Sequence, residues 1–441
     1  MSNTAIDDYN AHLGYHPSVV PLDIRLGLTT APDEDSPETK DPSSKPLRWG
    51  ILATGKVAHD FTQVLKFLSL TAGRHAIVAV GSRTQARADE FATLHSIPAA
   101  YGSYEDLCAD PNVDIVYVAS LHPDHRTHAE MALLNGKHVL VEKPMCMKAS
   151  DAQYLYDLGK EKKLFVGEGM WTRFFPVVEW ARMHMGENSA SDTGVICKGI
   201  GRVRVVQADF SIDGDDVGPY PSDSIYAREL GGSTLFTMAP YVISAAMMPF
   251  GKEPETIAAS GILPSAGENV GELAVGTTLV FKNEGICSRS ASSPPSEFSI
   301  ASGMVSYLAE SSEETMYAGK DGRITILGPA HCPTKACITP KQSGRGNSAS
   351  SSTDAEGIGT TTKDSSAPND IIVEFPLPAS LPEIEASGGI QMPNSIGFVY
   401  EAEAVRRLIG AGQTTFPQWT PEESIGCLRT IESALEQINK E

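Results

Sequence analysis

The chain has 441 residues, enough for about two domains with a sizeable core, and a formal net charge of −20. That charge argues against a surface for nucleic acid or an anionic membrane, because both reward clustered Lys and Arg. No stretch approaches the ~20 apolar residues that span a bilayer, and the scattered cysteines and absent signal-peptide pattern lead us to expect a cytoplasmic protein with reduced thiols.

Residues 1–46 are rich in Pro, Ser, Asp and Thr, which predicts a disordered acidic extension. From residue 47 onward, apolar runs typical of buried strands alternate with helical patterns of about 12 residues. The predicted strands are 48–52, 75–80, 114–121, 138–142 and 164–169, and the helices between them are 56–70, 84–95, 124–136 and 149–163. This alternation predicts an α/β domain over residues 47–168, with a doubly wound parallel sheet covered by helices on both faces.

After about residue 168 the pattern becomes rich in strands. Apolar and polar residues alternate with period two in 202–212, 271–283 and 313–328, the last of which contains a hairpin turn at 320–323. These segments predict an α+β domain over residues 169–441, with an open, mostly antiparallel sheet. It closes with amphipathic helices at 398–412 and 421–438. The Ser-, Gly- and Thr-rich residues 341–369 are expected to form a disordered loop.

The first predicted strand ends in a loop that resembles the G-x-G-x-x-G dinucleotide fingerprint. Ala53, Gly55 and Ala58 stand at its three glycine positions. A residue without a side chain at the second position lets the backbone approach a pyrophosphate at the helix N-terminus, so Gly55 matters most. We expect a Rossmann domain whose cofactor contacts include Ala53, Thr54, Gly55, Lys56 and Val57. The alternative is an ordinary strand-to-helix turn.

The end of the second predicted strand bears on the choice between NAD and NADP. Enzymes that prefer NAD usually carry Asp or Glu there, which binds the ribose 2′-hydroxyl. Here Ser82 and Arg83 end the strand, and Arg87 follows one helical turn later. A hydroxyl and guanidinium groups suit a 2′-phosphate, which a carboxylate would repel. We therefore predict NADP, against the alternative of solvated surface arginines.

Glu142, Lys143 and Pro144 end the fourth predicted strand, at the edge where a doubly wound sheet places its ligands. A buried lysine is unfavourable unless it is paired or functional. Pro144 restricts Lys143 to extended geometry, and a cis bond there would direct the ammonium into the crevice. Beside a cationic nicotinamide the pKa of Lys143 would fall. The alternative is a lysine that reaches past the strand end to water.

The sequence order A-T-G-x-x-A, G-S-R and E-K-P resembles the glucose-fructose oxidoreductase and inositol dehydrogenase family over about residues 47–440. Within that family, residues 168–176 (EGMWTRFFP) and 319–338 are similar to segments of dimeric dihydrodiol dehydrogenases and fungal NADP-dependent D-xylose dehydrogenases. The resemblance implies that Lys143 is catalytic. It also implies a second motif, G-G-x-x-x-x-D-x-x-x-Y, in which Tyr241 matches the tyrosine but Thr237 stands at the aspartate position.

An enzyme of this family would transfer hydride between a sugar or cyclic diol and the nicotinamide. Tyr241 is the candidate proton carrier, with its pKa lowered by the charge of Lys143, or the two roles are exchanged. Trp171 and Phe174 are candidates for an apolar wall against the substrate, which Thr237 and Tyr241 would also contact. Arg173 would position this wall or contact the cofactor. The further residues expected near the cofactor are Ser120, His122, Pro123, Glu142, Lys143, Trp171 and Arg173.

The sequence leads to three further expectations, about metal binding, regulation and assembly. His122, His125 and His128 are spaced along one helix face, but no carboxylate or cysteine completes a site, so no metal is expected. Thr237, the acidic extension and the Ser-rich loop favour an alternative function, a catalytically weak NADP-binding regulatory protein of the same fold. An open sheet with one uncovered face leads us to expect a homodimer.

Overall fold

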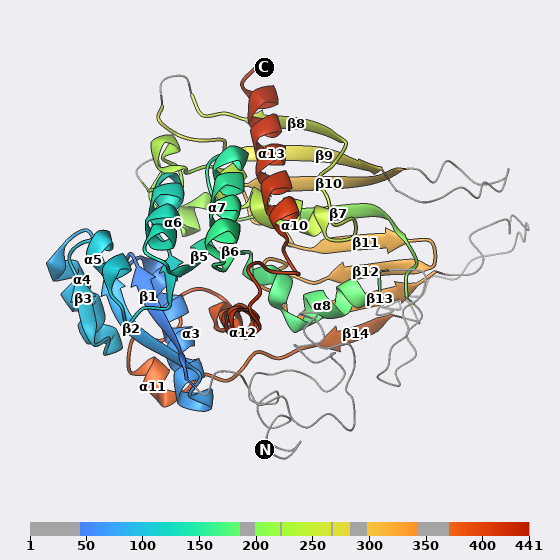
Figure 1. Cartoon of the computed structure of the whole chain (residues 1–441). Coiled ribbons are helices and arrows are strands. Elements are labelled where there is room, and N and C mark those ends of the chain that lie inside the picture. Colours follow the sequence, from blue (N-terminus) through green and yellow to red (C-terminus); the bar gives the residue numbers. More distant parts are fainter. Residues whose placement is uncertain are drawn as a thin grey trace, which may run out of the picture.

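The protein is described by a computed structural model that covers residues 45–185, 199–220, 223–265, 268–282, 298–341 and 370–440. Two sheets organise these residues (Figure 1). The predicted extension 1–46 and the predicted loop 341–369 lie almost entirely outside the described residues. Among the described residues no single helix is long and apolar enough to cross a membrane, although one bent pair, Arg228–Thr237 with Ala239–Met247, reaches that length and composition.

The first sheet has six parallel strands in the order β3-β2-β1-β4-β5-β6, which confirms the predicted doubly wound domain. Its strands are β1 (Leu47–Leu52), β2 (His75–Gly81), β3 (Ala99–Tyr101), β4 (Ile115–Val118), β5 (His138–Glu142) and β6 (Val166–Gly169). The strand order reverses between β1 and β4, and ligands of such sheets bind outside the carboxyl ends of the strands at this point. The loops after β1, β4 and β5 therefore meet where a cofactor is expected.

Five helices connect these strands: α3 (Lys56–Ala72), α4 (Gln85–His95), α5 (Tyr104–Ala109), α6 (His125–Leu134) and α7 (Ala149–Lys162). Local side chains define their ends. The Thr84 and Ser103 hydroxyls accept backbone N–H groups at the starts of α4 and α5, and Gly73, in the left-handed region with φ 64°, ends α3. Strand β3 and helix α5 were not predicted because each is too short to show a period.

The second sheet has eight strands in the order β14-β13-β12-β11-β7-β10-β9-β8. Its strands are β7 (Val203–Ser211), β8 (Thr256–Ile262), β9 (Ala274–Lys282), β10 (Phe298–Ser306), β11 (Thr315–Gly319), β12 (Gly322–Ile326), β13 (Lys335–Pro340) and β14 (Ile371–Glu374). Only the β7–β10 pair is parallel, so the prediction of a mostly antiparallel sheet is confirmed. Helices α8 (Pro176–Met183), α10 (Ala239–Met247) and α13 (Pro421–Ile438) pack against this sheet.

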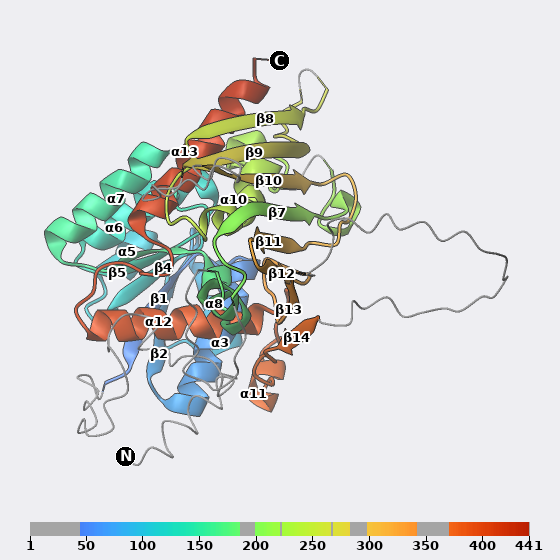
Figure 2. The same ribbon diagram turned by 90° about the vertical axis from the view of Figure 1, so that its right-hand side faces the viewer.

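The last part of the chain returns to the first sheet and joins the two units. Helices α11 (Pro382–Glu385) and α12 (Phe398–Gly410) pack against α3, and α13 contacts both α7 and β8 (Figures 1 and 2). The carboxylate of Asp60 on α3 accepts the backbone N–H groups of Gln391 (2.9 Å) and Met392 (2.8 Å). The predicted boundary at 168/169 falls at the end of β6, between the two sheets, and the returning segment contacts elements on both sides of it.

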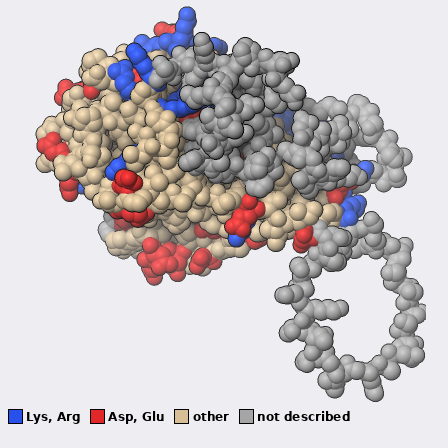
Figure 3. All heavy atoms as spheres, turned by 90° about the horizontal axis from the view of Figure 1, so that it is seen from below, with Lys and Arg blue, Asp and Glu red and all other residues tan. Residues whose placement is uncertain are grey.

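The charged side chains show no single large field on the face drawn in Figure 3. There the Lys and Arg of the described residues lie in small groups, several of them beside Asp or Glu, and residues of other types make up most of the surface that the described residues show. It offers, on this face, no continuous basic track of the kind that binds nucleic acid.

Candidate functional site

The loop after β1 forms an open cradle at the N-terminus of α3. Ala53 adopts the left-handed conformation with φ 83°, a position that glycine would occupy with less strain. Gly55 is the N-cap of α3, with φ −81° and ψ −178°, and a Cβ built on it meets no atom within 4 Å. The chain itself therefore does not require glycine here. The open space in front of the first N–H groups of α3 fits a phosphate instead.

A groove of about 410 Å³ begins at this loop. Its lining residues are Thr54, Gly55, Lys56, His59, Arg87, Glu90, Phe91, Leu94 and Gln391. Four of the predicted contacts, Thr54, Gly55, Lys56 and Arg87, thus share one cavity. The sequence analysis missed Gln391, because this residue comes from the returning segment more than 300 positions away. It is held there by the contacts of that segment with Asp60 and His59.

The end of β2 presents two exposed arginines beside a buried hydroxyl. Ser82 is buried and its Oγ lies 3.4 Å from Thr54 Oγ1, so the first two loops contact each other. Arg83 and Arg87 are exposed, and neither forms an ion pair with a described residue. Both guanidinium groups are therefore available, within the described part of the chain, to bind an anionic ligand; Arg87 lines the groove, and Arg83 precedes it in the sequence, just after the end of β2.

The three histidines after β4 make different contacts, and His128 places its Nδ1 2.8 Å from Ser120 Oγ. His122 Nδ1 lies 3.0 Å from Gly231 O, and desolvation, followed by the charges of His125 and Lys143, lowers its pKa to about 3. The buried His125 places its ring nitrogens 2.9 Å from Pro144 O and 3.0 Å from Ser120 O. His125 thereby connects the loops that follow β4 and β5. No group of three or more potential metal ligands occurs among the described residues.

Lys143 lies at the centre of the candidate site. Its peptide bond to Pro144 is cis. Its Nζ donates a hydrogen bond to the carbonyl oxygen of Thr237 (2.7 Å) and lies 4.7 Å from the centroid of the Tyr241 ring. Burial lowers the pKa of Lys143 to about 8, although the nearby Glu142 and Glu168 oppose the shift. A lysine of this pKa changes its protonation state close to neutral pH, as a proton-transferring group must.

Tyr241 is held by Trp171, whose Nε1 donates to the Tyr241 hydroxyl oxygen (3.0 Å). The expectation that Lys143 lowers the pKa of Tyr241 is wrong. Burial, followed by the charge of Glu142, raises the pKa of this phenol well above its usual value. Burial of the phenol is the largest cause of this shift, and the Lys143 ammonium, 4.7 Å from the ring centroid, does not offset it. Tyr241 thus remains protonated at neutral pH. This favours the alternative in which Lys143 transfers the proton and Tyr241 supports it.

Thr237, at the aspartate position of the motif, contributes its main chain to the site. Its carbonyl binds Lys143, whereas its buried hydroxyl has no hydrogen-bond partner among the described residues. The Thr237 side chain lies near the buried hydroxyl of Tyr307, where their contact opposes the rise in the pKa of Tyr307 that burial causes. Position 237 therefore supplies a hydroxyl and a carbonyl to this region but no charge.

Two of the predicted contacts belong to the structural framework instead. Phe174 is 1% exposed and packs against Phe416, so it is a core residue and no wall of a substrate pocket. Arg173 donates to Ser244, to the carbonyl of Gln418 and to Glu423, which leaves its guanidinium committed inside the protein. Ser244 lies one turn after Tyr241 on α10, so Arg173 positions the helix that carries the tyrosine.

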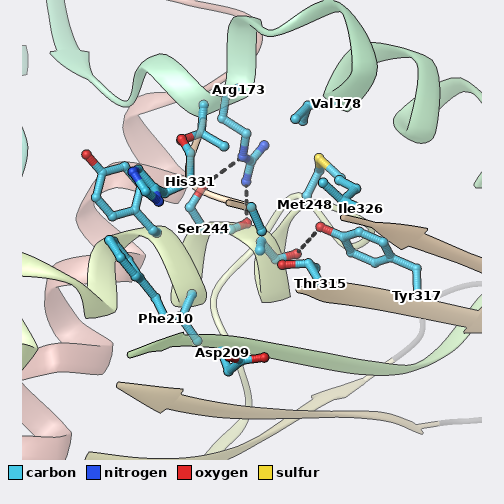
Figure 4. Close-up of a pocket in the computed structure, with 15 residues that line it drawn as sticks. Arg173, Val178, Asp209, Phe210, Ser244, Met248, Thr315, Tyr317, Ile326 and His331 are labelled. Carbon is cyan, nitrogen blue, oxygen red and sulfur yellow. Dashed lines mark hydrogen bonds between the residues drawn. The ribbon is translucent and has the colours of Figure 1, made fainter. Parts of the chain in front are cut away.

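A second hollow lies beside Tyr241, between η2 (Trp171–Phe174), α10 and the second sheet (Figure 4). His331 stacks on Phe210 with the ring centroids 4.4 Å apart and lies 5.6 Å from the Tyr241 ring. Its Nδ1 is 3.0 Å from the carboxylate of Glu313. The aromatic wall next to Tyr241 therefore consists of Trp171, Phe210 and His331. The sequence analysis missed the last two, although His331 falls inside the segment 319–338 that it singled out.

Comparison with known proteins identifies the family of the chain. A model of the oxidoreductase family with an NAD-binding Rossmann fold (GFO_IDH_MocA) matches residues 47–170. The trans-1,2-dihydrobenzene-1,2-diol dehydrogenase of Danio rerio is 34% identical over 373 residues, which cover 83% of this chain and 89% of that protein. The enzyme of the same name from Sus scrofa is 30% identical, and the match covers 89% of this chain and 96% of that protein.

Solved structures show the same fold at low sequence identity. A levoglucosan dehydrogenase in complex with NADH and levoglucosan matches with a TM-score of 0.68 at 15% identity, over 90% of this chain and 98% of that one. A 3-ketoreductase from Actinomadura kijaniata in complex with NADP matches with a TM-score of 0.62 at 18% identity, over 89% and 98%. One of these neighbours binds NADH and the other NADP, so the fold is compatible with either nicotinamide cofactor.

Proposed function

Because the chain belongs to the Gfo/Idh/MocA oxidoreductase family, we propose that it is an NADP-dependent dehydrogenase of a cyclic trans-dihydrodiol or an aldose sugar. The observation that supports this most is the placement of the Lys143 ammonium over the Tyr241 ring, at the carboxyl end of β5. The open cradle at Gly55 provides a matching place for the pyrophosphate. Both lie at the edge of the sheet where a bound dinucleotide is expected.

The chemistry follows from the two side chains. The nicotinamide, when bound, supplies the site that accepts hydride from the alcohol carbon. In its neutral form Lys143 accepts the hydroxyl proton, because its lowered pKa makes the free amine available near neutral pH. The Tyr241 phenol stays protonated and donates a hydrogen bond to the substrate oxygen, while the Trp171 N–H fixes its orientation. Trp171, Phe210 and His331 form an aromatic wall beside Tyr241, but the hollow that Phe210, His331 and Tyr241 line is only about 20 Å³, so a ring-shaped substrate would contact this wall from outside the hollow.

The test follows NADPH formation by its absorbance when purified protein receives NADP and a panel of cyclic diols and aldoses. We expect turnover with at least one member and a preference for NADP over NAD. Silence across the panel, together with quenching of tryptophan fluorescence by NADPH, would favour the regulatory alternative. Thr237 favours that alternative, since it leaves the position of the family aspartate without a charge.

The preference for NADP is expected to depend on the arginines after β2. A charge-assisted hydrogen bond contributes about 1.5–3 kcal/mol, so Arg83→Glu should raise KM for NADP by about 10- to 100-fold and leave KM for NAD nearly unchanged. Steady-state kinetics with both cofactors measure this ratio. Arg429→Gln, which removes an exposed arginine of α13 paired with Glu253, serves as the control. An equal change of both KM values would contradict a 2′-phosphate site.

We also propose a homodimer that forms through the outer face of the second sheet. Alternate residues of β10, Phe298, Ile300 and Met304, are each about half exposed on this face. Ile300→Glu should convert the dimer to a monomer, because it buries an unpaired charge in the interface. Light scattering at micromolar concentration measures the mass. Leu134→Glu on α6 is the control at an equally exposed apolar residue, and a parent protein that is already monomeric would refute the dimer.

A cytoplasmic location is proposed on the state of the cysteines. The five cysteines of the described residues, Cys108, Cys146, Cys332, Cys337 and Cys427, are all free thiols. Free thiols are typical of proteins in a reducing compartment. Fractionation of cells that express the chain would test this location.

A further inference from the structure

Glu401 on α12 is a buried carboxyl group without a hydrogen-bond partner. Its side chain is 0% exposed, and neither carboxyl oxygen has a partner among the described residues. The other buried glutamates nearby differ in this respect. Glu142 accepts from Tyr117, Glu168 accepts from Trp419 and Ser424, and Glu403 accepts from Arg406. A buried polar group that is left unpaired is rare enough to need an explanation.

The packing of α12 places Glu401 behind the candidate site. Phe398, one turn earlier on the helix, stacks on Trp171 with ring centroids 4.3 Å apart. Phe398 also meets Phe61 edge-on at 5.6 Å, and Phe61 stacks on Tyr117 at 3.9 Å. Residues three positions apart share a helix face. Glu401 therefore faces the same side as Phe398, toward the Trp171–Tyr241 pair and the Tyr117–Glu142 pair.

The groups that face Glu401 make a negative charge unfavourable there. They are Glu142 from β5, Glu168 from β6 and the hydroxyls of Tyr117 from β4 and Tyr241 from α10. Burial, followed by the charges of Glu142 and Glu168, raises the pKa of Glu401 well above its usual value. A carboxylate without donors beside two other carboxyl groups would be strongly destabilised. Glu401 thus carries a proton unless a positive charge arrives nearby.

We propose that Glu401 is a proton store whose occupancy follows the charge of the nicotinamide ring. This inference rests on the proposed function. The oxidised ring carries a positive charge that the reduced ring lacks, so binding of NADP⁺ favours release of the Glu401 proton and binding of NADPH favours its retention. During oxidation the alcohol gives hydride to the ring and its proton first to Lys143. Lys143 then releases its proton and the Glu401 carboxylate gains one, because the positive charge of the ring has disappeared. The alcohol becomes a carbonyl, NADP⁺ becomes NADPH, and Glu401 becomes a carboxylic acid.

Proton release on cofactor binding tests the proposal. Titration calorimetry in two buffers of different ionisation enthalpy counts the protons released when NADP⁺ or NADPH binds. We expect NADP⁺ to release up to about one proton more than NADPH. In the Lys143→Met background, where Lys143 cannot add to the count, Glu401→Gln should abolish this difference, and Glu401→Asp should retain most of it. Glu436→Gln, an exposed glutamate of α13, is the matched control and should behave as the parent.

A second readout needs no cofactor. The folded pKa of Glu401 is raised above its ordinary value of 4.5, so its contribution to stability is present below pH 4.5 and is lost as the pH rises toward the folded pKa. Relative to Glu401→Gln, the parent should therefore lose stability over this interval. The ratio of their unfolding equilibrium constants should change by up to about tenfold per pH unit. Urea unfolding at several pH values measures this ratio.

Each outcome has a separate meaning. Equal proton release by NADP⁺ and NADPH in the parent would overturn the proton store, even if Glu401→Gln failed to fold. Parallel stability curves for the parent and Glu401→Gln would overturn it as well. Binding of neither nucleotide would instead overturn the proposed function, and the coupling that rests on it. Loss of the difference when Glu401→Gln is added to Lys143→Met, with both nucleotides still bound, is the result that supports the proposal.

Discussion

Lys143→Met should reduce alcohol oxidation by about 10²- to 10⁴-fold, which is the range that a positioned acid or base contributes. The substitution keeps the length of the side chain and removes its amine. It removes a buried ammonium, which is favourable for stability, and it leaves the Thr237 carbonyl without its donor, which is unfavourable. Because these two effects oppose each other, the variant should unfold at a temperature close to that of the parent. Steady-state kinetics and thermal unfolding measure the two effects. Binding of NADPH should persist.

The pH dependence distinguishes a base from a fixed charge at position 143. If neutral Lys143 accepts the proton, the rate of oxidation should rise with pH through an apparent pKa near 8. Lys143→Arg keeps the positive charge but cannot lose a proton, so it should be as inactive as Lys143→Met at every pH. A Lys143→Arg variant that retains most of the turnover would contradict the role of Lys143 as the base. Tyr241 would then be the residue that accepts the proton.

Gly55→Ala should weaken the binding of NADP by about 100-fold or more, which corresponds to roughly 3 kcal/mol. The added methyl group meets no atom of the protein within 4 Å and the backbone conformation is open to any residue, so folding should be unaffected. The methyl group occupies the space through which the backbone approaches a pyrophosphate. Fluorescence titration with NADPH measures the dissociation constant.

Gly73→Ala is the matched control at the opposite end of the same helix. A Cβ at Gly73 also meets no atom within 4 Å, but its φ of 64° lies in the left-handed region. The variant should therefore lose about 1 kcal/mol of stability and bind NADPH as the parent does. A Gly55→Ala variant that binds NADPH normally would show that the pyrophosphate lies elsewhere.

The first sheet was predicted almost strand by strand because its strands are buried on both faces and follow one another in a regular rhythm. Strands β1, β2, β4, β5 and β6 agree with the predicted segments, although β4 ends at Val118 rather than at residue 121. Half of the second sheet was missed. The apolar residues of strands β8, β10, β13 and β14 do not follow a period of two that marks a strand with a buried face. These segments become strands because they pair with strands from distant parts of the chain.

In the candidate site, too, some residues could be predicted from the sequence and others could not. Gly55, Ser82 and Lys143 could be assigned because each lies at the end of a strand in a fold whose loops bind the ligand. The roles of the residues around Trp171 could not, because a 3₁₀ helix of four residues has no apolar face of its own. Which side Phe174 and Arg173 face depends on Phe416, Gln418 and Glu423, from the end of the chain.

The sequence alone determined the class of fold, the cofactor loop and the candidate lysine and tyrosine, since each depends on local spacing and strand order. Only the tertiary structure decided the pKa shifts and the hydrogen-bond partners of the residues in the candidate site. The raised pKa of Tyr241, the hydrogen bond from Lys143 to the Thr237 carbonyl and the unpaired carboxyl of Glu401 all arise where β4, β5, α10 and α12 lie close together. The physical reason is that desolvation and charge depend on neighbours in space, and α12 brings Glu401 to Glu142 across more than 250 residues of chain.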